Sequence, residues 1–389
     1  MAQHPFTMLD LDRELTTDQR MIRDVVAQFG REHIASNLRE WFEKESLPAR
    51  ELARELGSLG LLGMHLEGYD CAGTDATSYG LACLELEALD SGIRSLVSVQ
   101  GSLAMYAIHA FGTEAQKSEW LPAMARGEKI GCFGLTEADF GSNPSGMRTA
   151  ARQDGSDWIL NGTKFWITNA TLADVAVIWA QTDAGIHGFL VPTDTPGFSA
   201  RLIEHKLSLR ASHTAELVLD NVRLPASAIL PDAKGLRAAL SCLNEARFGI
   251  VFGVVGAARN CLETALTYSQ TRVQFDRPIA GFQLTQAKLA DMSTKLQTAY
   301  LLALHIGKLK DAEAVKPEHI SVGKFNNAKA ALDIARESRS ILGGAGISLE
   351  YPIMRHLTNL ESVITYEGTH EIHTLVIGEA LTGIPAYRG

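Results

Sequence analysis

The chain has 389 residues, of which 46% are hydrophobic, and its formal net charge at pH 7 is −9. This length predicts two or three domains, and the scattered lysines and arginines exclude the basic stripe of a nucleic-acid-binding protein. No apolar run reaches the roughly 18 residues that predict a membrane span. The five cysteines form no CxxC pair and Met1–Pro5 shows no signal sequence, so we expect a reduced, cytoplasmic protein.

Residues 10–130 are predicted to form helices. Thr17 is the expected start of the first helix, because apolar residues recur at helical spacing after it. These apolar residues are Met21, Val25, Val26 and Phe29. The segments Tyr79–Leu89 and Leu103–Phe111 have the same helical character.

Short β-favouring segments broken by turn dipeptides fill residues 131–235. Asn161-Gly162, between Trp158–Leu160 and Thr163–Thr168, predicts a hairpin. Two further segments are predicted to be buried strands: Val175–Trp179 and Gly188–Val191.

Long helices are predicted again in residues 236–389. The candidates are 236–272, 283–310, 317–342 and 368–382, which can pack as an antiparallel bundle. This order of helices, strands and helices does not alternate β with α, so it disfavours a doubly wound dinucleotide fold. The predicted fold is mainly α with a middle β domain. The predicted domains are residues 1–130, 131–235 and 236–389.

Two segments of the strand region are candidates for holding a flavin. Phe133–Glu137 and the following Phe140–Ser142 combine glycines, which admit close approach of a ligand, with the hydroxyls of Thr136 and Ser142. Trp166–Thr168 places an indole face beside a hydroxyl, which suits a planar ring system. Taken alone, each segment is more often an ordinary strand followed by a turn.

Glu367 lies where one predicted helix should end and the next begin, and Gly368 permits an unusual backbone angle after it. A carboxylate in this apolar corner is a candidate general base with a raised pKa. The alternative is an acid in the first turn of a helix, stabilised by the helix dipole. His370 and His373 are spaced His-Glu-x-His with no third ligand in view, so no metal site is predicted.

Arg94 and Ser95, preceded by Glu87, are candidates for binding a substrate carboxylate, because a guanidinium offers two parallel hydrogen bonds. The alternative is a local ion pair between Asp90 and Arg94, four residues apart on one helix.

Two segments near the ends of the long helices are further ligand candidates. Arg272 is a candidate pyrophosphate ligand, and the glycines after Leu342 allow backbone contact with a ligand. The alternatives are a solvated arginine and an ordinary helix end.

Each pattern is weak alone, but their joint order resembles the acyl-CoA dehydrogenase flavoproteins over essentially the whole chain. The matching segments are Phe133–Glu137, Trp166–Thr168, Arg272–Phe275, Leu342–Gly346 and Tyr366–Thr369. The resemblance implies an N-terminal helical domain, a middle β-barrel domain and a C-terminal four-helix bundle. Within the family, the most similar members are glutaryl-CoA dehydrogenases, on the segments Asp90–Ser95, Lys206–Ser212, Cys242–Arg247 and the one around Glu367.

The resemblance also implies roles for individual residues. It implies FAD contacts at Phe133, Leu135, Thr136, Gly141, Ser142, Trp166, Ile167, Thr168, Thr369 and Glu371. It implies contacts to the FAD of a neighbouring subunit at Arg272, Phe275, Gln283, Leu342, Gly343 and Gly344. It implies acyl-CoA contacts at Ser142, Leu243, Asn244, Arg247, Tyr366 and Gly368. Arg94 and Ser95, with Glu87 nearby, are implied to face the distal carboxylate of the substrate.

The activity implied by the resemblance is FAD-dependent α,β-dehydrogenation of a short dicarboxylic acyl-CoA, with Glu367 as the base. Its closest form is the oxidative decarboxylation of glutaryl-CoA to crotonyl-CoA and carbon dioxide. The implied electron acceptor is an electron-transfer flavoprotein, and the implied assembly is a homotetramer. Two alternatives stay open. One is a dehydrogenase of this fold without decarboxylation or with an acyl-carrier-protein substrate, and the other is a non-catalytic flavin- or acyl-CoA-binding protein.

Overall fold

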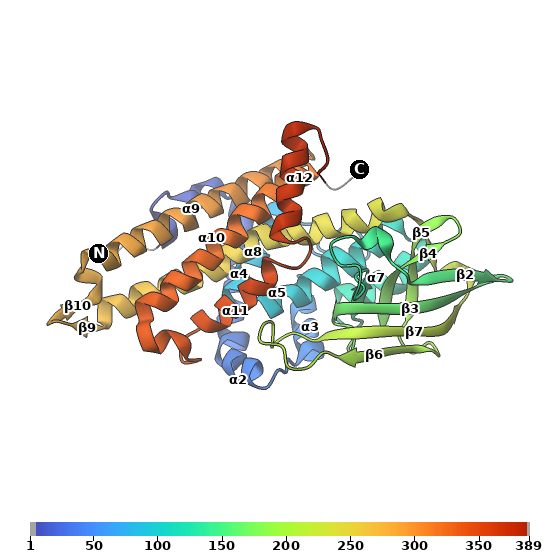
Figure 1. Cartoon of the computed structure of the whole chain (residues 1–389), viewed down its shortest axis with the longest axis horizontal. Coiled ribbons are helices and arrows are strands. Elements are labelled where there is room, and N and C mark those ends of the chain that lie inside the picture. The colour runs from blue at the N-terminus through green and yellow to red at the C-terminus, as the bar shows by residue number, and fades with distance from the viewer. Residues whose placement is uncertain (1–4, 387–389) are drawn as a thin grey trace.

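The computed structural model describes residues 5–386. Figure 1 shows a sheet at one end of the molecule and long helices that extend away from it. The segment Met1–Pro5, in which no signal sequence was predicted, lies outside the described residues except for Pro5.

Seven α-helices precede the sheet in the described part of the chain. They are α1 Thr17–Phe29, α2 Leu38–Glu43, α3 Ala49–Ser58, α4 Ala76–Leu89, α5 Ser91–Ser98, α6 Tyr106–Phe111 and α7 Glu114–Ala125. The first helix begins at the predicted residue because Thr16 and Gln19 form a capping box, in which each side chain accepts a hydrogen bond from the other's backbone N–H.

The predicted apolar face of α1 is only half correct. Val26 and Phe29 are buried, whereas Met21 is 57% exposed and Val25 is 50% exposed. The predicted helix at Leu103–Phe111 is the end of a longer helical run. This run joins α5, a π-helical stretch at Val99–Met105, and α6.

Eight strands in residues 131–234 form one sheet. They are β1 Gly131–Gly134, β2 Ala150–Asp154, β3 Asp157–Thr168, β4 Val175–Thr182, β5 Gly185–Pro192, β6 Phe198–Leu202, β7 Thr214–Leu224 and β8 Ile229–Lys234. Their order is β6-β7-β3-β2-β4-β5-β8, with β1 parallel to β4. Side chains from six of these strands fill one core that is separate from the helical core, among them Cys132, Ala151, Leu160, Ile178, Phe189 and Leu217. A sheet with its own core agrees with the predicted middle β domain.

The predicted hairpin at Asn161-Gly162 is wrong. β3 runs through both residues, and β7 pairs with it on either side of a bulge between Leu160 and Gly162. Gly162 has φ +149°, and a Cβ there would lie 2.5 Å from the Thr149 hydroxyl oxygen. Gly162 therefore lies at a β-bulge in a paired strand and not in a turn. The chain reverses instead at Gly155, between β2 and β3.

The C-terminal region is helical apart from a two-stranded hairpin. Its elements are α8 Gly235–Thr271, β9 Val273–Gln274, β10 Arg277–Pro278, α9 Gln283–Asp311, α10 Pro317–Leu342, α11 Ile353–Val363 and α12 His370–Thr382. Helix α11 was not predicted, because the glycines and Pro352 before it are typical of loops. The last helix begins at His370, two residues later than predicted, so Glu367 and Gly368 lie in the turn before it.

Helix α8 is long and apolar enough to cross a membrane by length and composition alone. Of the most apolar 18-residue window of this helix, 67% is buried inside the protein. It packs against α4, α9 and α10, which is the position of a core helix.

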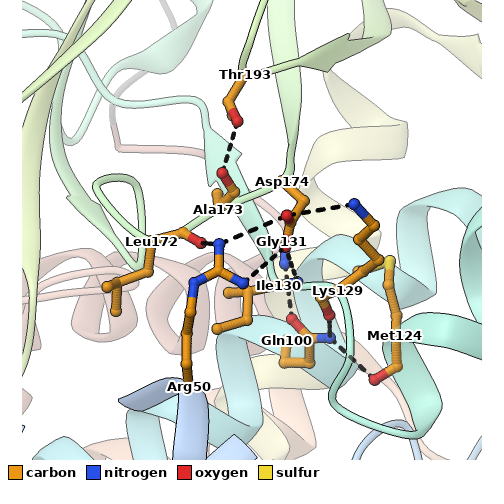
Figure 2. A network of polar contacts seen from close by, with 10 residues as sticks. All are labelled: Arg50, Gln100, Met124, Lys129, Ile130, Gly131, Leu172, Ala173, Asp174 and Thr193. Carbon is orange, nitrogen blue, oxygen red and sulfur yellow. Dashed lines mark hydrogen bonds and ion pairs between the residues drawn. The ribbon is translucent and has the colours of Figure 1, made fainter. Parts of the chain in front are cut away.

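A polar network joins the N-terminal helices to the sheet where β1 begins (Figure 2). The Gln100 side-chain oxygen accepts a hydrogen bond from the Gly131 N–H at 2.8 Å. The Asp174 carboxylate accepts one from the Ile130 N–H at 2.8 Å and lies 3.3 Å from a guanidinium nitrogen of Arg50 on α3. These bonds fix the path of β1, which leads into the candidate flavin segment.

We expect Asp174→Asn to lower the melting temperature by about 2–6 °C at pH 7. Burial alone would raise the pKa of Asp174, but the Ile130 N–H and Arg50 hold that pKa below its usual range. Hydrogen bonds to a charged group contribute about 1.5–3 kcal/mol. This contribution is present above the unfolded pKa of about 3.9 and is lost as pH falls through the lower folded pKa.

Thermal unfolding of Asp154→Asn is the control, because Asp154 makes only an exposed ion pair with Arg223. Equal shifts in the two variants would show that the Asp174 network adds no more than a surface pair.

Candidate active site

A buried ion pair joins α4 and α5. Arg94 Nε lies 2.7 Å from Glu87 Oε2, and the two side chains are 1% and 0% exposed. The Ser91 hydroxyl donates to the other Glu87 oxygen at 2.8 Å. A Cβ at Gly253 of α8 would lie 2.1 Å from Glu87 Oε2, so only glycine leaves room for the pair there. The pair is therefore built into the packing of three helices.

The alternative of a local pair between Asp90 and Arg94 is wrong. Asp90 caps α5 by accepting the Gly92 N–H at 2.7 Å. Its other carboxylate oxygen binds Arg355 at 2.7 Å and Asn359 at 2.9 Å. Because α11 supplies these partners, the Asp90 charge is satisfied away from Arg94.

Tyr366 connects the ion pair to the segment that carries Glu367. Arg94 Nη2 donates to the Tyr366 hydroxyl, and the guanidinium lies 5.8 Å from the centre of the ring. The Ser95 side chain lies against the same hydroxyl. Burial raises the pKa of Tyr366, so the hydroxyl stays protonated. Among residues 5–386, no group accepts a hydrogen bond from Arg94 Nη1, so this nitrogen can bind a further acceptor.

Glu367 lies in the turn between α11 and α12 with φ +51°, and Gly368 follows with φ +92°. A left-handed backbone is rare for a residue with a side chain and occurs often at functional sites. Glu367 Oε2 is buried without a hydrogen-bond partner within the described chain. Burial raises the pKa of this carboxyl, and nearby cations offset part of the rise: Arg94, Lys324 and Arg247. Such a carboxylate is suited to accept a proton.

The alternative role of Glu367 as an acid in the first turn of a helix is wrong. Helix α12 begins at His370, and its cap is Thr369, whose side chain accepts the Ile372 N–H at 3.2 Å. The acid in its first turn is Glu371, which is exposed.

Arg247 of α8 packs under the Glu367 turn. Its Nε donates to the Glu367 carbonyl oxygen at 2.6 Å, and its Nη1 donates to the Asn244 side chain at 3.1 Å. A Cβ at Gly368 would approach Arg247 Nη2 to 3.3 Å. The structure thus brings together eight of the predicted substrate and catalytic residues: Glu87, Arg94, Ser95, Asn244, Arg247, Tyr366, Glu367 and Gly368. Leu243 is half-buried on the same stretch of α8, and Ser142 lies exposed in the loop after β1.

The two candidate flavin segments of the sheet lie side by side. The Phe165 N–H donates to the Thr136 carbonyl oxygen at 2.8 Å. In the second segment, Trp166 is 55% exposed and has φ +62°. Within the described chain the hydroxyls of Thr136 and Thr168 have no hydrogen-bond partner. An exposed indole beside free hydroxyls fits a planar ring with polar edges.

The other predicted flavin contacts differ in which of their atoms a ligand can reach. Phe133, Leu135 and Ile167 are buried in the cores, so their backbone atoms are the groups that a ligand can reach. Gly141 has open space around it and Glu371 is exposed.

The remaining predicted cofactor residues lie at the opposite end of the helices. They line two adjoining grooves of about 870 and 440 Å³: Arg272, Phe275, Gln283, Leu342, Gly343 and Gly344. Arg247 and Arg272 lie on or directly after α8, 25 residues apart, which at 1.5 Å per residue is about 38 Å. One chain therefore does not bring this set to the Glu367 site.

His370 and His373 have separate partners. The His370 ring stacks on Phe325 with 4.0 Å between ring centres. His373 Nδ1 lies 3.1 Å from the Ser321 hydroxyl, and burial lowers the pKa of His373 to about 3. Both rings therefore pack within the helical bundle, although His370 Nδ1 and His373 Nε2 are buried without a hydrogen-bond partner in the described chain.

Sequence reasoning missed Lys324, Ser91 and Gly253. Lys324 is the most informative of these, because its ammonium lies under the Glu367 turn. A signal was present: Lys324 stands in a row of residues at helical spacing that a bundle would bury, namely Ile320, Asn327 and Ala331.

Three domain families match the chain in the same order as its three regions. They are "Acyl-CoA dehydrogenase, N-terminal domain" at residues 16–128, "middle domain" at 132–222 and "C-terminal domain" at 233–382. The chain belongs to the acyl-CoA dehydrogenase family. The predicted family and fold are confirmed.

Known acyl-CoA dehydrogenases cover nearly the whole chain. The short-chain specific enzyme of Bos taurus mitochondria is 35% identical over 96% of this chain and 92% of its own length. A solved glutaryl-CoA dehydrogenase from Mycobacterium smegmatis is 63% identical over 100% of both chains, with a TM-score of 0.99. A second one, in complex with FADH2, is 64% identical over 100% of both chains, with a TM-score of 0.98.

Proposed function

We propose that this protein oxidises a short dicarboxylic acyl-CoA, and that its substrate is glutaryl-CoA, which it converts to crotonyl-CoA and carbon dioxide. The observation that carries the proposal is the buried cluster in which Arg94 meets both Glu87 and Tyr366, one residue before Glu367. An acyl pocket for an uncharged chain has no need of a buried arginine. A carboxylate entering it must lose its water, which is costly without a charged partner.

The cofactor is FAD, as in this family. Thr136, Trp166 and Thr168 form the surface that would hold the flavin ring. Bound FAD supplies the acceptor for the hydride that leaves the β-carbon of the substrate.

Glu367 is proposed to remove the α-proton of the thioester. Its unpartnered Oε2 and raised pKa suit this task, since a base with a pKa nearer neutrality binds the proton more strongly. Negative charge grows on the thioester oxygen as the proton leaves, so a hydrogen-bond donor is required at that oxygen. The Glu367 N–H is the proposed protein donor.

Arg94 Nη1 and the Ser95 hydroxyl are proposed to receive the distal carboxylate. Loss of the α-proton and the β-hydride leaves a carbon–carbon double bond next to the carbon that carries this carboxylate. The carboxylate then leaves as carbon dioxide, and its electron pair moves into a dienolate. Protonation of this dienolate by Glu367 gives crotonyl-CoA.

We also propose a homotetramer and an electron-transfer flavoprotein as the electron acceptor. The support for sharing FAD between subunits is the separation of about 38 Å along α8 between Arg247 and Arg272. The second groove would then contact the FAD of a neighbouring chain.

The test of the proposed function is anaerobic absorbance titration of the purified protein with a panel of acyl-CoA thioesters, followed by product analysis. Glutaryl-CoA should bleach the flavin fastest and yield crotonyl-CoA. Faster bleaching by butyryl-CoA would favour the uncharged substrate of the short-chain enzymes. Bleaching by glutaryl-CoA without release of carbon dioxide would favour the alternative of a dehydrogenase that does not decarboxylate.

Arg272→Ala is expected to weaken FAD retention about tenfold or more, because hydrogen bonds from arginine to phosphate oxygens are charge-assisted. The measurement is the flavin-to-protein absorbance ratio after dialysis, with the free FAD concentration varied. Arg336→Ala is the control, since Arg336 lies on α10 and pairs only with Glu361 on the surface. Equal flavin content in both variants would remove Arg272 from the cofactor site.

A further inference from the structure

Three consecutive carbonyl groups of the Glu367 turn each accept a hydrogen bond from a cation. Lys324 Nζ donates to the carbonyl oxygens of Tyr366 and Gly368, the second at 2.6 Å. Arg247 Nε donates to the carbonyl oxygen between them, that of Glu367, at 2.6 Å. Lys324 is 2% exposed, and no carboxylate forms a salt bridge with it among residues 5–386. A buried ammonium whose partners are backbone carbonyls is costly unless the turn requires it.

The direction of the Tyr366 carbonyl decides the direction of the next N–H. The described chain contains no cis peptide bond, so the carbonyl of Tyr366 and the N–H of Glu367 point in opposite directions across one planar unit. Because the carbonyl points toward Lys324 on α10, the N–H points away from α10. Within the described residues this N–H has no acceptor, and the Glu367 Oε2 has no partner either. One residue thus offers both a free donor and a free base.

We infer that Lys324 is a positioning residue that aims and polarises the Glu367 N–H toward the thioester oxygen of the substrate. The inference rests on the proposed function, in which Glu367 is the base. A cation on the carbonyl oxygen draws electron density from the peptide unit, so its N–H becomes a stronger donor. A donor fixed before the reaction stabilises the growing oxyanion without reorganisation.

The lysine side chain of Lys324 suits the positioning of the Glu367 N–H better than a neutral side chain would. An ammonium has three donors on a long stem, which lets one group hold both carbonyls that flank Glu367. Burial lowers the pKa of Lys324 to about 7, while the nearby Glu367 carboxylate favours the charged form. Charged and titratable side chains around this turn come from five helices and the turn itself: Glu87, Arg94, Arg247, Lys324, His370, His373 and Tyr366.

The first test compares Lys324→Met, which keeps the length and removes the donors, with Lys329→Met, an exposed change on the same helix. Lys324→Met should retain FAD and substrate affinity but slow flavin reduction about 10–10²-fold, somewhat less than removal of a whole oxyanion donor. Lys329→Met should match the wild type. Wild-type reduction by Lys324→Met would overturn the inference. If Lys324→Met does not fold, Lys324→Gln replaces it and should also slow flavin reduction, because its amide keeps two N–H donors but is shorter and carries no charge.

The second test separates aiming of the N–H from mere support of the turn. A 3-oxoacyl-CoA ionises to an enolate whose negative charge is shared between the thioester oxygen and the 3-oxo oxygen, and its ultraviolet absorbance reports the ionised fraction. In a Glu367→Gln background, which removes the base, adding Lys324→Met should raise the apparent pKa of the bound ligand by about one unit. An unchanged apparent pKa would mean that Lys324 only supports the fold.

The two proposals fail separately. Near wild-type flavin reduction by Glu367→Gln alone would remove the base and with it the proposed function. A slow Glu367→Gln together with a fast Lys324→Met would remove only the role of Lys324.

Discussion

Glu367→Gln is expected to lower the rate of flavin reduction by glutaryl-CoA about 10²–10⁴-fold, the span typical of general-base removal, while FAD stays bound. The amide has nearly the shape of the carboxylate but cannot take the α-proton. The carbonyl that Arg247 holds and the N–H of residue 367 belong to the backbone, so both survive the change. The loss should therefore appear in the rate at saturating substrate. Stopped-flow absorbance under anaerobic conditions measures it.

The pH dependence gives an independent check on Glu367. Its pKa is raised, mainly by burial, and only the deprotonated form is a base. The reduction rate of the wild type should rise as pH passes upward through this raised pKa. The Gln variant should lack that limb, and Glu361→Gln, an exposed change on α11, should keep it. A variant that keeps both the rate and the limb would remove Glu367 from the reaction.

The order of the elements could be predicted from sequence because local patterns decide it. Helical spacing after Thr17 and β-favouring residues at Val175–Trp179 needed no knowledge of their neighbours. The errors lie where a distant segment decides. Asn161-Gly162 has the composition of a turn, but β7 pairs on both sides of it. Met21 and Val25 are apolar, as core residues are, but only one side of helix α1 is buried.

The site residues also divide into those that a local pattern predicts and those that depend on distant segments. Glu367 could be proposed from sequence because a glycine follows it at a helix junction and because the family resemblance assigns it the role of base. The left-handed backbone conformations of Glu367 and Trp166 could not be predicted from sequence, since neither residue type favours that conformation. The partner of Arg94 depended on packing between α4, α5 and α8, whereas spacing alone favoured Asp90, four residues away, over Glu87. The role of Lys324 required the path of a turn 43 residues later in the sequence.

Arg94 is expected to determine the preference for a dicarboxylic substrate. Replacing it alone is a poor test, because Glu87 would be left buried and unpaired, and breaking a buried pair typically costs about 3–5 kcal/mol. The structure therefore calls for a double change, Glu87→Gln with Arg94→Gln, which removes both charges and keeps polar groups in contact. The matched control is Glu87→Gln alone, in which the arginine remains and can still donate to an amide oxygen at position 87 and to the Tyr366 hydroxyl.

The expected result is a fall of about 10²-fold in kcat/KM for glutaryl-CoA in the double variant, or about 2.8 kcal/mol at 1.4 kcal/mol per tenfold. Butyryl-CoA brings no charge, so its kcat/KM should be unchanged or improved. The control should keep the preference for glutaryl-CoA or strengthen it, since the remaining arginine can turn its full charge to the substrate carboxylate. The deciding quantity is the ratio of the two efficiencies. If that ratio is the same in the wild type and the double variant, the buried pair only holds α4 and α5 together, and the preference for a dicarboxylic substrate must come from elsewhere.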